Sequence, residues 1–144
     1  MPTNLKLFLK ENKKEKQTTT YPATRSLCDE KGEPLPWTIK AITTEEAEKI
    51  REDCTIDVQV DGKPGLYRQK LISTKYVAKL MCACVVVPDL YNKDLQDSYG
   101  VMTPEALIKA MIDNPGEYND FASFIQNYNG FDETIQDKVD EAKN

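Results

Sequence analysis

The chain has 144 residues, of which 40% are hydrophobic and 30% are charged, which is typical of one globular domain with a buried core. Its longest uncharged apolar stretch, residues 80–88, is far shorter than the roughly 20 residues that a membrane-spanning helix needs. The apolar N-terminal residues alternate with charges and precede no small-residue cleavage site, so we expect a cytoplasmic protein without a secretory signal.

The net charge of −5 is distributed unevenly along the chain. Residues 1–20 carry five Lys and two Glu (net +3), residues 21–88 carry ten basic and ten acidic residues (net 0), and residues 89–144 carry four basic and twelve acidic residues (net −8). This asymmetry predicts complementarity to a partner or to a second copy, or else two solvated surfaces. Nucleic-acid binding is disfavoured, because neutralising phosphates requires clustered Lys and Arg on the folded part.

The first 20 residues are predicted to form a flexible N-terminal segment with a short apolar head. Leu5, Phe8 and Leu9 have the i, i+3, i+4 spacing of a helical turn. KENKKEKQTTT follows without a core residue and is interpreted as a linker. Residues 21–144 are then expected to form a single domain, to which the head is tethered.

A β-hairpin is predicted at the start of this domain. Residues 21–27 and 36–42 form its two strands, and Gly32 supplies the turn conformation. A helix follows, with Thr43 as its N-cap and Glu46 completing a capping box. TIDVQV alternates again after this helix, DGKPG is a turn, and LYRQKLI is a weaker candidate for a returning strand.

The rest of the chain has a helical pattern. Ser73 or Thr74 is expected to cap a buried helix that Pro88 stops, and a short helix near 93–99 follows. Thr103 caps the next helix, with Pro104 at its first position. The following helix has an apolar stripe, and Asp132 caps a last one. The predicted fold is therefore α+β and mainly α, with N-terminal β-hairpins packed on a C-terminal bundle of about five short helices.

The four cysteines raise the question of a metal or redox site in MCACVVV, residues 81–87. On a helix, residues i and i+2 point about 200° apart, so Cys82 and Cys84 would not share a metal ion. Cys28 and Cys54 lie too far upstream for zinc spacing. We therefore expect four reduced cysteines that act as small hydrophobic residues, with a metal or thiol-redox role for Cys82 and Cys84 as an alternative.

Other catalytic signals are weak. The chain has no His, so the usual general base and the Ser–His and Cys–His pairs are absent from the sequence. There is no phosphate-binding glycine loop. Acidic pairs such as Glu45–Glu46 suit the dipole at a helix N-terminus better than they suit acid–base chemistry, and residues 89–97 lack the glycine and final Glu of a calcium loop. The residues thus predict a binding domain with no catalytic residue and no cofactor.

Several stretches together resemble the XkdN-like tail assembly chaperones of bacteriophages and phage-like elements with long tails. The resemblance covers most of residues 20–144 and depends on the order and spacing of structural positions. The stretches are PWTIKAITTEEAEKIREDCT, VVVPDL, LQDSYGV, the GEY helix with its following NGF, and the chain end EAKN.

The resemblance implies a non-catalytic function in virion assembly. Such proteins bind the tape-measure protein, a very long and partly apolar helical chain, and help tail-tube subunits to assemble around it. They are expected in the cytoplasm of the bacterial host cell and absent from the mature virion. A structural tail completion or connector protein that stays in the virion is the alternative.

The chain end carries a further hypothesis drawn from the resemblance. Many tail chaperones are made in two lengths by ribosomal frameshifting. Ala142-Lys143-Asn144 can be encoded GCA AAA AAC, which contains the slippery heptamer A AAA AAC. The chain is then the short product, and a longer form of itself becomes another partner; alternatively, these residues are an ordinary helix end.

Two surfaces are the candidates for partner binding. The first is formed by the C-terminal helices, with an apolar edge and an acidic rim. The second is the tethered head, which is able to lie in a groove of a partner or of another copy. The residues of the first are Tyr118, Phe121, Ile125 and Tyr128 with Asp132, Glu133 and Asp137; those of the second are Leu5, Phe8 and Leu9.

Overall fold

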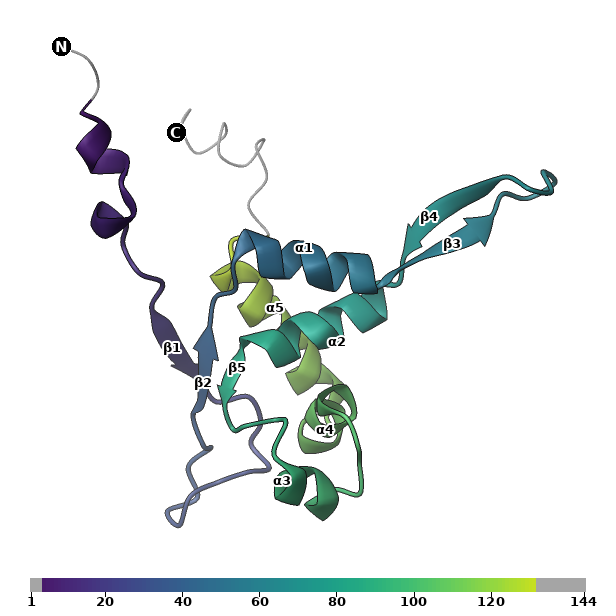
Figure 1. Cartoon of the computed structure of the whole chain (residues 1–144). Helices are drawn as coiled ribbons and strands as arrows, with labels where there is room; N and C mark the ends of the chain where they lie inside the picture. The colour runs from purple at the N-terminus through teal and green to yellow at the C-terminus, as the bar shows by residue number, and fades with distance from the viewer. Residues whose placement is uncertain (1–3, 132–144) are drawn as a thin grey trace, which may run out of the picture.

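A computed structural model describes residues 4–131 of the chain. Its helices and strands form a compact body from which two segments project (Figure 1). In chain order the elements are η1 (Leu5–Phe8), η2 (Lys10–Asn12), β1 (Thr18–Tyr21), β2 (Trp37–Lys40), α1 (Thr44–Asp53), β3 (Thr55–Gln59), β4 (Tyr67–Leu71), α2 (Ser73–Cys84), β5 (Val85–Val87), α3 (Lys93–Ser98), α4 (Pro104–Met111) and α5 (Pro115–Tyr128).

The body combines a small antiparallel sheet with packed helices. The strand order is β1-β2-β5, and β1 pairs with β2 in the register Tyr21↔Trp37 and Thr19↔Ile39. The central strand turns Trp37 and Ile39 into the core, where both are buried. The α+β prediction, with N-terminal strands followed by helices, is confirmed.

Helix α2 organises the core. It contacts α1, α4 and α5, and its buried residues include Leu80, Met81, Cys82 and Cys84. Burying such side chains contributes roughly 1.5–3 kcal/mol for each large one. The body is therefore stabilised mainly by apolar packing around α2.

The predicted helix caps are confirmed in two places. The Thr43 hydroxyl accepts from the Glu46 N–H at 3.2 Å, and the Glu46 carboxylate accepts from the Thr43 N–H at 3.2 Å, which completes the capping box of α1. Thr103 caps α4 with Pro104 at its first turn. The cap predicted for α2 is wrong: Ile72 occupies the N-cap position and no side chain caps the helix.

Two strand boundaries differ from the prediction. The first strand is Thr18–Tyr21 rather than 21–27, so Thr18, Thr19 and Thr20 belong to the sheet rather than to the predicted linker. β-Branched threonines favour a strand, and Tyr21 fixes its end by stacking on Phe121 and Phe124. Residues 22–36 form a loop in which Gly32 has φ 84°, as a turn requires.

The buried helix ends earlier than predicted. It stops at Cys84, and Val85–Val87 form β5, which pairs with β2 through Ile39↔Val85 and Thr38↔Val87. Three consecutive β-branched residues next to an open sheet edge favour the strand over another helical turn.

The second hairpin forms as predicted but does not pack on the helices. β3 pairs with β4 from Thr55↔Leu71 to Gln59↔Tyr67, as a separate two-stranded sheet. It projects from the end of α1 and the start of α2, on the other side of the body from the N-terminal residues (Figure 1). We call residues 55–71 the hairpin arm and residues 4–17 the N-terminal arm.

Candidate binding surfaces

Three of the four cysteines pack in the core, and this position explains them better than a reactive role does. Cys82 and Cys84 are both on α2, both buried and both free thiols, as is Cys54. Burial raises the pKa of the Cys82 thiol from 9.0 to about 12, so this group is a poor nucleophile and a poor metal ligand at neutral pH. The interpretation as a small hydrophobic residue is wrong for Cys28, which is exposed.

The side chains of the other suspected sites have structural roles. Asn92 caps α3 by accepting from the Leu95 N–H at 2.9 Å, and Asp89 accepts from the Tyr91 N–H at 3.0 Å, so residues 89–97 form a turn and a helix start. Residues 4–131 contain no cluster of three or more Cys, Asp or Glu side chains suited to a metal ion. No helix among them is long and apolar enough to cross a membrane.

The predicted surface on the last helices is corrected by the core packing. Phe121 and Ile125 are fully buried, because α5 turns this stripe towards β2 and α2; Phe121 meets the Trp37 ring edge-on at 5.6 Å between centroids. These two residues therefore belong to the core and are not an exposed edge. Tyr118 and Tyr128 are half-buried, and Asp132, Glu133 and Asp137 lie outside the described residues.

A carboxylate on α5 holds the long loop against the body. Glu117 accepts from the Thr24 hydroxyl at 2.7 Å and from the Arg25 N–H at 2.9 Å. The Arg25 N–H, followed by the Thr24 hydroxyl, lowers the pKa of Glu117, because both donate to the ionised carboxylate. Sequence reasoning did not identify this contact, because Thr24 and Glu117 are 93 positions apart.

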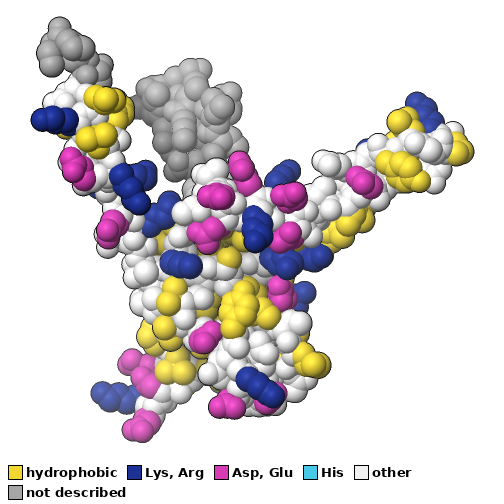
Figure 2. Space-filling model, in the orientation of Figure 1, with side chains coloured by type: hydrophobic (Ala, Val, Ile, Leu, Met, Phe, Trp, Pro, Cys, Tyr) yellow, Lys and Arg dark blue, Asp and Glu magenta, His cyan; other side chains and the backbone are white. Residues whose placement is uncertain are grey.

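The N-terminal arm is an unpartnered apolar segment. Leu5 and Phe8 are 73% and 72% exposed, and Leu9 is 44% exposed. Asn4 caps the first turn, and the Lys13 N–H donates to the Lys10 carbonyl in the second. At its base, the Tyr128 hydroxyl donates to the Gln17 carbonyl. The arm thus has local order of its own while its large apolar side chains face solvent (Figure 2).

The hairpin arm is a second exposed apolar surface, which sequence reasoning missed. Ile56, Leu66 and Tyr67 are 45%, 51% and 61% exposed. Figure 2 shows hydrophobic side chains along this projection. A lone two-stranded hairpin is marginally stable in water, and its outer edges leave backbone groups unpaired. The sequence around DGKPGLY predicted a hairpin. Only the projection of this hairpin from the body shows that its apolar side chains face solvent.

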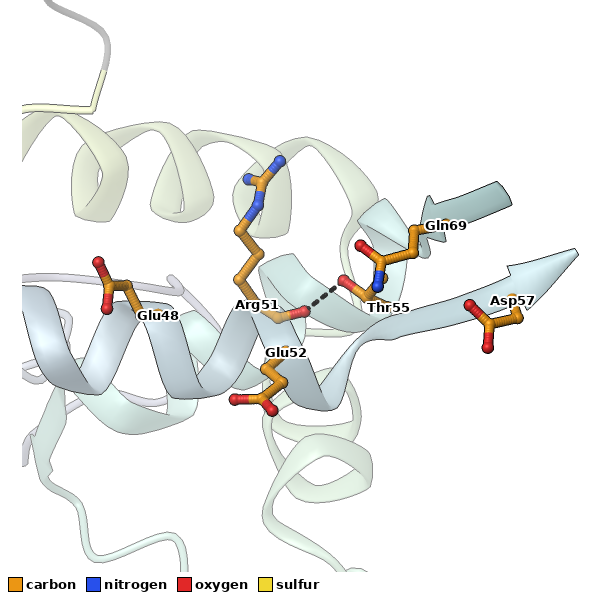
Figure 3. A pocket seen from close by; sticks show the side chains of 6 residues that line it. All are labelled: Glu48, Arg51, Glu52, Thr55, Asp57 and Gln69. Carbon is orange, nitrogen blue, oxygen red and sulfur yellow. Dashed lines mark hydrogen bonds between the residues drawn. The ribbon is translucent and has the colours of Figure 1, made fainter. Parts of the chain in front are cut away.

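Helix α1 presents a dense acidic face. It carries five acidic and two basic residues. Figure 3 shows Glu48, Glu52 and Asp57 around a shallow pocket of about 430 Å3 that runs from α1 onto β3. The Arg51 side chain points away from Glu52 there (Figure 3). Within residues 4–131 the ion pairs are Arg25–Glu117 and Lys79–Glu105, so no charge of α1 is paired.

A groove lies on the other side of α1, between it and α2. We call it the α1–α2 groove; its volume is about 360 Å3. Ile50, Cys82, Ala83 and Tyr91 line its apolar part, and Lys79 pairs with Glu105 across it at 3.6 Å.

These surfaces are suited to holding other protein chains, and comparison with known proteins defines the class. The chain belongs to the family of phage XkdN-like tail assembly chaperone proteins, whose family model matches residues 5–143. It is therefore a phage tail assembly chaperone by family.

Individual relatives agree with this assignment. Over 141 residues the chain is 27% identical to the phage-like element PBSX protein XkdN of Bacillus subtilis (strain 168), covering 98% of this chain and 94% of that protein. It is 26% identical to the uncharacterized protein YqbN of the same strain, covering 98% and 93%. The crystal structure of the protein yqbn matches with a TM-score of 0.75 at 21% identity, over 92% of this chain and all of that chain, which supports the fold.

Proposed function

We propose that the chain binds the tape-measure protein during tail assembly and helps tail-tube subunits to assemble around it, without a catalytic step. The family supports the assembly role. The observation that carries the binding role is the hairpin arm, which projects from the body and exposes Ile56 on one face and Tyr67 on the other, with Leu66 beside the turn. Contiguous exposed apolar surface is typical of a protein-interaction site.

The geometry of the hairpin arm suits a long apolar client. Ile56 pairs across the strands with Lys70, and Val58 pairs with Arg68, so one face combines two aliphatic side chains with two long basic ones. The alkyl stems of Lys and Arg extend apolar surface while their charges stay in water. Such a face holds an apolar helix of the client by contact area rather than by one specific pocket.

Co-expression with the tape-measure protein of the same phage or phage-like element tests this role. We expect the tape-measure protein in the soluble fraction only when this chain is present, and bound to it on purification. The Ile56→Glu variant is expected to lose most of this recovery, because a charge replaces an exposed apolar contact on that face. Met102→Glu is the matched control, since Met102 is 90% exposed and lies outside both arms.

Two results would contradict the proposal. One is insoluble tape-measure protein whether or not the wild-type chain is present. The other is equal recovery with Ile56→Glu and wild type, which would remove the hairpin arm from the binding role.

We also propose that the protein acts in the host cytoplasm and is absent from the mature virion. Mass spectrometry of purified particles tests this, because a completion or connector protein would appear there at a stoichiometric level.

The frameshift hypothesis for residues 142–144 concerns the gene rather than the described fold. An A-run in the codons for Ala142, Lys143 and Asn144, with an open −1 frame behind it, is expected if a longer form exists. Codons that interrupt the run would remove the hypothesis.

A further inference from the structure

We propose that the N-terminal arm docks on a second copy of this chain, across helix α1, in a reciprocal exchange that forms a dimer. The apolar head of the arm, Leu5 and Phe8, enters the α1–α2 groove of the other copy. The lysines that follow lie over the acidic face of α1. The hairpin arm stays free for the client.

The arm has the composition of a docking segment without a partner in its own copy. Its large apolar side chains Leu5, Leu7 and Phe8 are each at least 70% exposed. Its backbone bonds are local: the Leu9 N–H donates to the Lys6 carbonyl at 3.2 Å, and the Asn12 side chain donates to the same carbonyl. The arm is thus held as two turns that extend from β1 away from the body (Figure 1).

Charge selects the surface that this arm would occupy. Residues 1–20 have a net charge of +3, from five Lys and two Glu. Helix α1 has a net charge of −3 within ten residues, from five acidic and two basic residues, and none of these charges is paired within the described part of the chain. Figure 2 shows several acidic side chains over α1, with fewer basic ones among them. Attraction between opposite patches favours this docking.

The other open surfaces fit less well. The hairpin arm carries two Asp against two Lys and one Arg, so its net charge of +1 repels a basic segment. The pocket beside Arg25 and Glu117 is polar, and those two side chains already pair there. Two hollows place an apolar lining beside the most acidic helix: the α1–α2 groove, with Ile50, Ala83 and Tyr91, and a hollow lined by Ala47, Tyr76 and Phe131. The charges of the second hollow, Glu48 and Arg51, cancel, whereas the α1–α2 groove has three carboxylates against two lysines and suits a basic arm better.

The distances permit the arm to straddle α1. Glu46, Ile50 and Asp53 face the groove on one side of the helix, and Glu48 and Glu52 face the shallow pocket on the other. A helix with its side chains is roughly 10–12 Å across. With Lys10–Asn12 kept as a 3-10 turn, which rises roughly 2 Å per residue, and the other residues extended, the chain from Phe8 to Lys13 and Lys14 spans roughly 13–16 Å. The head therefore reaches one side while the lysines reach the other.

A charge-swap experiment on the full chain tests the exchange. Two double variants are compared: the arm variant carries Lys13→Glu and Lys14→Glu, and the helix variant carries Glu48→Lys and Glu52→Lys. In a homodimer, each variant places like charges against each other. Sedimentation or light scattering should give about twice the 16.4 kDa chain mass for the wild type and the monomer mass for each variant alone. An equimolar mixture of the two variants should recover the dimer, because both of its arm contacts then join opposite charges.

Further variants separate the apolar and electrostatic parts. Phe8→Glu is expected to weaken the dimer at least about tenfold, since it removes a buried aromatic side chain. Met102→Glu should leave the dimer unchanged, because Met102 is even more exposed than Phe8 (90% against 72%) and lies outside the groove. Raising the salt concentration should weaken the wild-type dimer, because exposed charges are screened. Circular dichroism checks that each variant is folded.

Each other outcome overturns the proposal in a defined way. A wild-type monomer at every concentration measured excludes the exchange. Variants that stay monomeric when mixed show that the arm of one copy does not dock on α1 of the other. A dimer that tolerates Phe8→Glu and both charge variants uses another surface. Client binding is a separate readout: Phe8→Glu should spare tape-measure recovery, and Ile56→Glu should spare the dimer, so failure of one proposal does not imply failure of the other.

Discussion

Phe8 and Phe121 are the same residue type in two regions with opposite physical roles. Phe121 has no exposed surface and packs between the Tyr21 ring, at 5.4 Å between centroids, and Trp37. Phe8 is 72% exposed on an arm that extends away from the body (Figure 1). The body buries most of its large apolar residues, although Met102 and Tyr91 on its surface are exposed, whereas the large apolar residues of the two arms are all half-buried or exposed. The difference supports the proposal that the arms bind other chains.

The largest effect is expected in the core. Phe121→Ala should lower the free energy of unfolding by about 3–5 kcal/mol, because it removes two aromatic contacts and leaves a cavity. Urea denaturation followed by circular dichroism measures this. A loss below about 1 kcal/mol would mean that α5 is not held as described.

The reactivity of the thiols is expected to distinguish the three buried cysteines from the exposed Cys28. With a disulfide-forming probe near pH 8, Cys28 should react in the folded protein, whereas all four thiols should react in denaturant. The pKa of about 12 for Cys82 adds a pH dependence: its contribution to stability is complete below pH 9.0 and is lost as pH rises towards 12, because the unfolded thiol ionises first. Rapid reaction of all four thiols under native conditions would contradict the buried assignment. Cys28→Ser is the control that should abolish the native signal.

A smaller effect is expected at the cap of α1. Thr43→Ala should cost about 1 kcal/mol, since it removes the hydroxyl that accepts from the Glu46 N–H. Thr44→Ala is the matched control, because Thr44 is the first residue of the helix and is exposed. Equal losses for the two variants, measured by thermal unfolding, would exclude the capping box as the cause.

The smallest stability effect is expected on the N-terminal arm. Phe8→Glu should change the free energy of unfolding of the monomer by no more than about 0.5 kcal/mol, because the side chain makes no core contact. Denaturation at a concentration below that of self-association measures this. A large loss would show that the arm supports the body and would remove the contrast with Phe121.

The sequence predicted features that depend on local chemistry. Thr43 with Glu46, and Thr103 with Pro104, define helix starts within four residues, and α5 follows from its apolar spacing. The α+β class follows from the order of such elements, and the family from their spacing along the chain.

Features that depend on distant partners could not be predicted in this way. Val85–Val87 form a strand because β2 offers a free edge for pairing. The apolar stripe of α5 packs against Trp37 and α2 instead of forming an exposed surface. The exposure of the hairpin arm could not be predicted either, since the alternation of apolar and polar residues does not tell which face of a strand packs against another element.

The most direct test of the central claim is hydrogen–deuterium exchange on the protein with and without bound tape-measure protein. The account predicts that binding slows exchange in residues 55–71 and leaves the core strands β2 and β5 unchanged, because the client occupies the hairpin arm while the body keeps its fold. Slower exchange elsewhere, with residues 55–71 unaffected, would contradict the claim that this exposed arm holds the client.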